Sequence, residues 1–277
     1  MRLAVLSGKG GTGKTFVSVN LASVAKEAIY LDCDVEEPNG WIFLKPELEK
    51  KQTISVPYPQ VDQARCHGCK KCVEFCKFNA LSYVGEKLLV FPQMCHSCGG
   101  CVLLCPQKAL VEIEREIGSI EYGRAGELET RGGILKLGEP SGVPIIEKLI
   151  GSIPAGKPAV IDCPPGSSCT VMESISKSDY CLLVTEPTAF GIHNLALVLE
   201  LVKLMDKPHG VLINKGLPGE TMARDYCIRE GLTILETIPY DSKLAYTISQ
   251  GQLAVEKPKY RQLFEGLLGR IEKEAGL

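Results

Sequence analysis

A glycine-rich loop near the N-terminus is the first place in this 277-residue sequence where the residue types could do chemistry. Residues 7–15 are SGKGGTGKT, which fits the pattern G-x-x-x-x-G-K-[ST] from Gly8 onward. Glycines in such a loop let backbone N–H groups turn toward phosphate oxygens, the last lysine reaches the β- and γ-phosphates, and the final hydroxyl ligates Mg²⁺. We predict a phosphate site formed by Gly8, Gly10, Gly11, Thr12, Gly13, Lys14 and Thr15.

This loop contains two lysines, although one is enough for the terminal phosphate. Lys14 holds the position that reaches the β- and γ-phosphates. Lys9 lies near the start of the loop and cannot easily fold back to the same oxygens. We expect its ammonium to reach outward, to a nucleotide held by a facing subunit, and a free surface lysine is the alternative.

Aspartates at the ends of two apolar runs are candidates for binding the metal and the attacking water. Asp162 follows the run 159–161 and opens the segment DCPPG, so we predict that it holds Mg²⁺ together with Thr15. Asp32 and Asp34 follow the run 28–31, and alternation along an extended segment directs both toward the phosphates. One of them would orient the attacking water, and turn capping is the alternative.

Eight of the thirteen cysteines lie in two runs with the spacing C-x2-C-x2-C-x3-C. The segment CHGCKKCVEFCKFNAL recurs at an offset of 29 residues as CHSCGGCVLLCPQKAL, which indicates a duplicated unit. Such runs bind [4Fe-4S] clusters, and in two-cluster ferredoxins the fourth cysteine of each run ligates the other cluster. We predict one cluster on Cys66, Cys69, Cys72 and Cys105 and a second on Cys95, Cys98, Cys101 and Cys76.

Zinc is the alternative metal for these cysteines, but zinc sites usually pair C-x2-C units across longer spacers. Pro106 follows Cys105 as the ferredoxin pattern expects. At the equivalent position of the first run, Lys77 follows Cys76 and places a cation near one cluster.

Two further cysteines, Cys163 and Cys169, flank the segment PPGSS. We expect them to pack structurally, and a metal ligand at a dimer interface is the alternative.

Alternating apolar strands and helical stretches must position these residues. Strands are predicted at residues 2–6, 28–31, 159–161, 181–184, 211–213 and 234–238, and helices at 15–26, 192–204 and 221–230. This alternation predicts an α/β P-loop NTPase fold with a mostly parallel sheet flanked by helices, and ligands bind beyond the carboxyl ends of such strands.

The cysteine repeat interrupts this alternation. We therefore predict a discontinuous ATPase domain, residues 1–60 and 113–277, with an inserted small α+β domain of the bacterial ferredoxin type at residues 61–112. Residues 113–142 are glycine-rich and have hairpin potential, and no chemical role is assigned to them.

Composition and charge exclude several function classes. The net charge of −2 implies no general attraction to nucleic acid or to an anionic membrane surface. No apolar run approaches the roughly 18 residues that cross a bilayer, and numerous cysteines suit metal binding in a reducing compartment. We expect a cytoplasmic protein whose last helix, within residues 260–277, packs its apolar face on the sheet.

The segment KGGTGKT, with its early lysine, resembles the deviant Walker A motif of the MinD/ParA/Mrp/nitrogenase iron protein class of ATPases. The segments LDCDVEEPN, IDCPPGSSC, LLVTEPTAFGIHNL and VLINKG resemble one branch, the MinD-type P-loop ATPases with an inserted ferredoxin domain. The resemblance implies that Lys9 inserts across a nucleotide-sandwich homodimer and that Asp34 and Asp162 are the switch I and switch II aspartates. It also implies adenine contacts from Asn214, Pro239 and Asp241.

These expectations combine into a slow Mg²⁺-dependent ATPase in which Lys9, Lys14, Asp34 and Asp162 act in catalysis. We expect ATP to close a homodimer and so to control electron transfer or metal-cluster assembly through two [4Fe-4S] clusters, with a redox or cluster-accepting protein as the partner. The alternative is a positioning or partner-binding ATPase of the MinD/ParA kind, in which the clusters are only structural.

Overall fold

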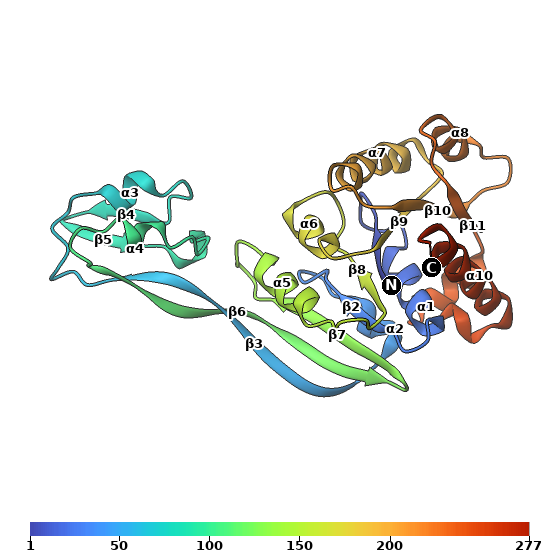
Figure 1. Cartoon of the computed structure of the whole chain (residues 1–277), viewed down its shortest axis with the longest axis horizontal. Coiled ribbons are helices and arrows are strands. Elements are labelled where there is room, and N and C mark those ends of the chain that lie inside the picture. The colour runs from blue at the N-terminus through green and yellow to red at the C-terminus, as the bar shows by residue number, and fades with distance from the viewer. Residues whose placement is uncertain (277) are drawn as a thin grey trace.

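One nine-stranded sheet organises the computed structural model, which describes residues 1–276 (Figure 1). Its strand order is β11-β10-β9-β1-β8-β2-β7-β6-β3. Neighbours from β11 to β7 run parallel, and only β7–β6 and β6–β3 run antiparallel. The predicted mostly parallel sheet is therefore confirmed. The strands are β1 (Arg2–Leu6), β2 (Ile29–Asp32), β3 (Glu47–Val61), β6 (Leu110–Ala125), β7 (Leu128–Leu135), β8 (Ala159–Asp162), β9 (Tyr180–Thr185), β10 (His209–Gly216) and β11 (Ile234–Pro239).

The central strands are buried on both faces, which explains their nearly continuous apolar sequences. In β1, Ala4 and Leu6 join the core on one face of the sheet, and Leu3 and Val5 join the core on the other. The first core includes side chains of α5 (Val143–Gly151), α6 (Cys169–Ile175), α7 (Ala189–Leu204) and α8 (Met222–Arg229). The second includes side chains of α1 (Lys14–Val24), α2 (Gly40–Leu44), α9 (Ser242–Ser249) and α10 (Pro258–Glu274).

The last long helix, α10, packs as its amphipathic pattern predicts. Its buried side chains Phe264, Leu267 and Ile271 belong to the second core, and Phe264 meets Phe16 of α1 edge to face at a centroid distance of 5.6 Å. The helix ends at Glu274, and Leu277, the last residue of the predicted range, lies outside the described residues. Within residues 1–276, no helix combines the length and the apolar character needed to cross a bilayer.

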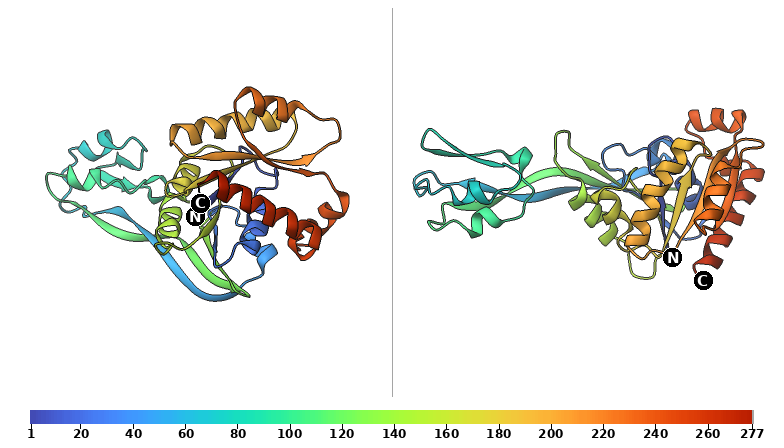
Figure 2. Two further views of the ribbon diagram at one scale, coloured as in Figure 1. Left: turned by 45° about the vertical axis from the view of Figure 1, so that its right-hand side comes forward. Right: turned by 90° about the horizontal axis from the view of Figure 1, so that it is seen from above.

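A long two-stranded ribbon leads from the sheet to a smaller unit (Figure 1). Strands β3 and β6 pair antiparallel from Glu47 opposite Arg124 to Val61 opposite Leu110. A hairpin does lie within residues 113–142, but its turn is between β6 and β7 and is closed by Ala125 opposite Leu128, whereas the segment RGGILKLGEPSG that indicated it forms the end of β7 and the connection to α5. Figure 2 shows from two further sides that the smaller unit lies at the far end of the ribbon.

We call residues 61–112 the cysteine module and the large sheet with its helices the body. The module contains α3 (Lys71–Phe75), β4 (Leu81–Val84), β5 (Lys87–Val90), the 3-10 turn η1 (Pro92–Met94) and α4 (Gly100–Leu103). Its small core consists of Cys72, Leu81, Leu88, Cys101 and Leu110. Because β3 and β6 continue from the module into the body without a break, the division into domains at residues 60/61 and 112/113 stays a prediction.

All three predicted helices differ from the observed ones at one or both ends, and the largest shift is at the start of α7. Helix α7 begins at Ala189 rather than at residue 192, because Thr188 caps it and its hydroxyl accepts a hydrogen bond from the Gly191 N–H at 3.0 Å. The extra turn brings Phe190 onto the helix, next to the glycine-rich loop.

Candidate functional site

The glycine-rich loop joins β1 to α1 at the carboxyl end of the sheet. Gly11 and Gly13 have φ angles of 80° and 94°, in the left-handed region that glycine adopts without strain. A Cβ on Gly8 would lie 2.1 Å from the carbonyl oxygen of Asn194 in α7, so a close approach of two backbones requires glycine there. A Cβ on Gly10 would have no other atom within 4 Å, so the space beside this residue is open.

Lys14 and Asp162 form a buried ion pair at the start of α1. The Lys14 ammonium donates to a carboxylate oxygen of Asp162 at 2.7 Å and lies 3.8 Å from Asp34. Burial alone would lower the pKa of Lys14, but the charges of Asp162, Asp34 and Asp32 raise it overall, so the ammonium stays charged. The sequence-predicted residues Lys14, Asp34 and Asp162 are thus brought together, and Thr15 is the next residue along α1.

Two side chains that the sequence analysis missed hold Asp162 in place. The Ser18 hydroxyl donates to Asp162 at 2.9 Å, and the Tyr30 hydroxyl donates to its other oxygen at 3.1 Å. Both signals are present in the sequence: Ser18 lies one helical turn after Lys14, and Tyr30 lies two residues before Asp32 on the same face of β2. The contact between Tyr30 and Asp162 could not be recognised from the sequence, because it depends on β2 lying beside β8.

Asp32 is completely buried beside Asp162, which it opposes in the register of β2 and β8. One of its oxygens accepts a hydrogen bond from the Gly40 N–H at 2.8 Å. Burial, and then the neighbouring Asp162 charge, raise the pKa of Asp32 to about 7. Burial also raises the pKa of Asp34 to about 6, although Lys14 opposes the shift.

Lys9 is held by its own chain in this structure. Its ammonium lies 2.7 Å from Glu186 and 4.9 Å from the ring centroid of Phe190. Glu186 also pairs with Lys215 at 2.6 Å, and Lys215 donates to the carbonyl of Gly11 at 2.8 Å. Burial opposes ionisation of Glu186, but the two lysines together hold its pKa below the usual value. The role of Lys9 in a facing subunit stays a prediction.

The three predicted adenine contacts lie in different settings. The Asn214 side chain donates to the carbonyl of Thr12 at 2.7 Å and so fixes the glycine-rich loop. Asp241 caps α9, since its carboxylate accepts from the N–H groups of Lys243 and Leu244 and from the hydroxyl of Tyr260. Pro239 lines a cavity of about 360 Å³ between the ends of β10 and β11. Adenine binding by these residues stays a prediction.

The first predicted set of cysteine ligands lines a single hollow. Cys66, Cys69, Cys72 and Cys105 all face it, and they come from two runs that are distant in sequence. Burial raises the pKa of Cys72, and the charges of Cys69 and Cys105 act in the same direction. In the second set, burial and then Cys95 raise the pKa of Cys101 to about 11.

Backbone N–H groups point at three of these thiols, as they do toward sulfur ligands in metal sites. The sulfurs of Cys76, Cys95 and Cys105 accept from the N–H groups of Ala80, Ser97 and Ala109 at 3.4, 3.4 and 3.2 Å. Among residues 1–276, no three histidine, cysteine or acidic side chains converge closely enough to hold a single metal ion.

The cysteines outside the module separate into buried and exposed ones. Cys163 is completely buried, and burial raises its pKa well above the ordinary value, which agrees with structural packing. Cys169 is exposed at the first residue of α6.

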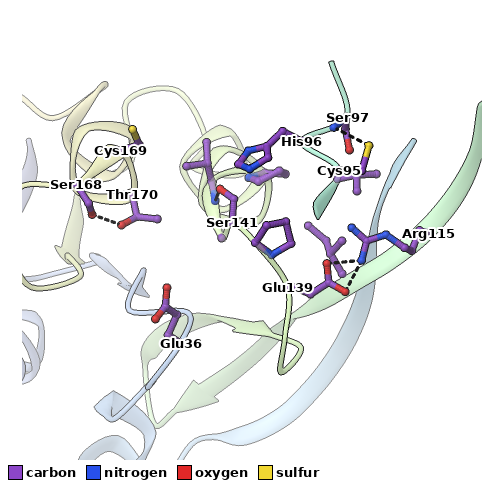
Figure 3. A pocket seen from close by; sticks show the side chains of 16 residues that line it. Glu36, Cys95, His96, Ser97, Arg115, Glu139, Ser141, Ser168, Cys169 and Thr170 are labelled. Atoms are coloured by element: carbon purple, nitrogen blue, oxygen red, sulfur yellow. Dashed lines mark hydrogen bonds and ion pairs between the residues drawn. The ribbon is translucent and has the colours of Figure 1, made fainter. Parts of the chain in front are cut away.

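A cavity of about 580 Å³ separates the body from the module (Figure 3). Ser168, Cys169 and Thr170 line it from the body, and Cys95, His96 and Ser97 line it from the module. Glu36, close to Asp34 in sequence, also faces it, as does the ion pair between Arg115 and Glu139. The loop of the second cysteine run therefore faces the segment that follows Asp162.

Comparison with known proteins agrees with this geometry. Residues 3–255 match the family model described as the CobQ/CobB/MinD/ParA nucleotide binding domain. The chain belongs to this family. An uncharacterized protein of Methanocaldococcus jannaschii is 31% identical over 222 residues, which cover 78% of each chain.

Two solved structures show the same fold. The septum site-determining protein MinD of Pyrococcus horikoshii, complexed with Mg-ADP, superposes with a TM-score of 0.60 at 18% identity and covers 99% of this chain and 96% of its own. The MinC:MinD cell division protein complex of Aquifex aeolicus has a chain that superposes with a TM-score of 0.57 at 16% identity, covering 99% and 95%. The family membership and the MinD-like fold expected from the sequence are confirmed.

Proposed function

We propose that this chain is an ATPase that changes its partner contacts with the nucleotide it holds, as a member of the MinD/ParA group would. The observation that carries the proposal is the buried pair of Lys14 and Asp162 at the mouth of the glycine-rich loop. ATP phosphates would attract Lys14 away from Asp162, and the freed carboxylate would then hold Mg²⁺ with Thr15. The Mg-ADP in the similarly folded P. horikoshii protein supports this choice of ligand.

Lys9 is our candidate for the residue that couples ATP binding to dimerisation. Its ammonium occupies an ion pair with Glu186 rather than the phosphate site of its own loop. When Lys9 leaves Glu186, the carboxylate remains paired with Lys215, so the loss of Lys9 does not leave a buried charge without a partner. In our proposal Lys9 then contacts the phosphates of a facing copy and stabilises the charge that develops during transfer.

The comparisons support a partner-binding function better than a function in electron transfer or cluster assembly. The relatives of similar fold are named for cell division, and one of them is in a complex with MinC. A second candidate function, electron transfer or cluster assembly, is favoured by the hollow that Cys66, Cys69, Cys72 and Cys105 line together. The donor set suits a [4Fe-4S] cluster, which would supply one-electron chemistry at the end of the ribbon.

A mixed-dimer experiment tests the ATPase proposal. Lys9→Ala should bind ATP as a monomer but lose ATP-driven dimerisation and about 10³-fold in hydrolysis, because a cation supplied in trans to phosphoryl transfer is worth that much. Mixing it with Lys14→Ala should restore part of the activity, because a mixed dimer has one site with both lysines. Light scattering and phosphate release measure the two effects. Wild-type hydrolysis by Lys9→Ala alone would refute the trans role.

Iron and acid-labile sulfide analysis of anaerobically purified protein tests the cluster proposal. Two clusters of the four-iron type predict about eight irons per chain and a broad visible absorption. Stoichiometric zinc without that absorption would refute it, and the ATPase proposal would be unaffected.

A further inference from the structure

The two cysteine sets differ at corresponding backbone positions. With the offset of 29 residues, Lys70 corresponds to Gly99, and Lys108 corresponds to Asn79. All four have positive φ: 60° at Lys70, 71° at Gly99, 49° at Lys108 and 54° at Asn79. Glycine and asparagine tolerate this left-handed region, whereas lysine is strained there. The same conformation occurs at Lys45 and Lys215 in the body, so what sets Lys70 and Lys108 apart is their position beside the first cysteine set.

Both strained lysines belong to the first cysteine set. Lys70 and its neighbour Lys71 line the hollow of that set, and Lys108 lies between two residues that also line it, Gln107 and Ala109. At the second set the equivalent of Lys71 is Gly100, where a Cβ would lie 2.2 Å from the ring of Phe75. Packing thus excludes a lysine at Gly100 and leaves room for one at Lys71.

The lysines of the first set are available to a partner. Lys70, Lys71 and Lys108 are exposed, and none of them forms an ion pair within residues 1–276. The Lys70 ammonium lies over the ring of Tyr83, 5.6 Å from its centroid, so an aromatic face rather than a carboxylate is its partner. An isolated basic rim of this kind attracts an acidic surface.

The two sets also face different ways. Cys95, His96 and Ser97, from the second set's loop, line the cavity shared with the body (Figure 3). The residues that line the first hollow all belong to the cysteine module. The first hollow is therefore bounded by the module alone, whereas the Cys95 loop of the second set faces the nucleotide-binding body.

We propose that the first cysteine set is the docking end of the module and that its partner is a small acidic electron-carrier protein. The proposal rests on the second candidate function above, because it assumes a cluster on this set. Two exposed leucines, Leu103 and Leu104, directly precede Cys105, and an apolar spot beside a basic rim is typical of a protein interface. A nucleic acid would instead be held by a longer row of cations along its phosphates.

The test exchanges the strained lysines for the residues of the other set. Lys70→Gly with Lys108→Asn should leave the melting temperature equal or higher, because both residues relax. The matched control, Lys77→Gln with Lys87→Gln, removes the same charge from the same module at two residues that do not themselves line the first hollow. The probe is an acidic flavodoxin, and its dissociation constant is measured anaerobically by surface plasmon resonance at low salt. We expect about a tenfold rise for the first pair and less than about a twofold rise for the control.

A second measurement follows reduction by stopped-flow absorbance. The anionic flavodoxin hydroquinone loses one electron and becomes the neutral semiquinone, and the oxidised cluster gains that electron, with no proton transferred. The second-order rate constant for reduction of the cluster should fall in the Lys70→Gly, Lys108→Asn variant and stay unchanged in the Lys77→Gln, Lys87→Gln control.

The outcomes separate the proposals. Equal weakening by both pairs would overturn the inference, because net charge alone would then explain binding. Tighter binding to anionic vesicles or to single-stranded DNA, with the same dependence on the lysines, would also overturn it. Absence of iron in the wild type would refute the cluster proposal, while the binding contrast between the two pairs would still decide whether an acidic protein docks here.

Discussion

The glycine-rich loop and the cysteine module differ in what surrounds their reactive groups. In the loop, Lys14 is paired with Asp162, and Lys9 is paired with Glu186. In the module, the eight cysteines form no disulfide, and two of the five residues of its core are Cys72 and Cys101. The body thus has a complete core and a satisfied site, whereas the module is small and depends on thiols that a metal cluster would bind.

The difference teaches how the two parts are stabilised and connected. The body is built from helices on both faces of a sheet and should fold whether or not the module holds metal. The module is joined to it by β3 and β6 and faces it across the cavity between Cys95 and Cys169. Nucleotide binding and metal binding should therefore be separable by substitution, while a rearrangement near Asp162 should still be felt by the second cysteine set.

The largest expected effect comes from Lys14→Ala. Without the ammonium, the β- and γ-phosphates lose their main cation, and ATP binding should become undetectable by calorimetry at micromolar concentrations. The iron content should match the wild type, because Lys14 lies in the body and touches no residue of the module. Loss of iron together with ATP binding would contradict the independence of the two parts.

Asp162→Asn should bind ATP but hydrolyse it at least about 10²-fold more slowly, because the substitution removes the negative charge that holds Mg²⁺ and leaves the phosphate loop intact. Steady-state kinetics should show the loss in kcat rather than in KM. An unchanged kcat would exclude Asp162 from the site. Ser18→Ala, which removes a hydroxyl that contacts Asp162 and the Lys14 carbonyl oxygen but leaves the carboxylate charge in place, is a control with a smaller expected loss.

Gly8→Ala should lower the stability of the body. Its Cβ would meet the Asn194 carbonyl oxygen at 2.1 Å, and overpacking against a backbone atom costs about 1–3 kcal/mol. For a chain of this size the melting temperature should fall by about 2–10 °C. Gly10→Ala is the matched control, since no atom lies within 4 Å of its Cβ position. Equal melting temperatures for the two variants would show that α7 does not press on the loop.

A smaller effect concerns the pH dependence of the nucleotide-free protein. The pKa of Asp32 is raised from 3.8 to about 7, so its protonated form is favoured by folding. Its contribution to stability is present below about pH 4 and is lost as the pH rises through 7. Asp32→Asn, which stays neutral, should therefore melt higher than the wild type at pH 8 and depend less on pH. If the melting temperatures of the wild type and of Asp32→Asn change with pH in the same way, the raised pKa of Asp32 is refuted.

The parts of the site that could be predicted are those encoded by local spacing. The glycine-rich loop and the C-x2-C-x2-C-x3-C runs depend on residues a few positions apart, and the apolar strands indicated the sheet that carries Asp34 and Asp162. Contacts across the sheet could not be predicted: Tyr30 meets Asp162 only because β2 lies beside β8, and Glu186 meets Lys9 only because β9 lies beside β1.

The ribbon was missed for a different reason. Residues 47–53 are largely polar and exposed, because the first half of the edge strand β3 covers no core, whereas Ile54 and Val56 in its second half are buried. Its partner β6 begins 49 positions after β3 ends, and no apolar run marks either strand from end to end. The hairpin between β6 and β7 lies in the stretch expected to contain one, but its turn comes before the glycine-rich segment RGGILKLGEPSG that indicated it.

The proposal that most needs a test is that nucleotide in the loop acts, across the cavity, on the clusters proposed for the cysteine module. Electron paramagnetic resonance of the chemically reduced protein, recorded with and without ATP and Mg²⁺, tests it most directly. We predict a changed cluster signal on ATP binding in the wild type and no change in Lys9→Ala, which binds ATP without dimerising. Identical spectra of a wild type shown by light scattering to have dimerised would contradict the claim and leave the clusters a purely structural role.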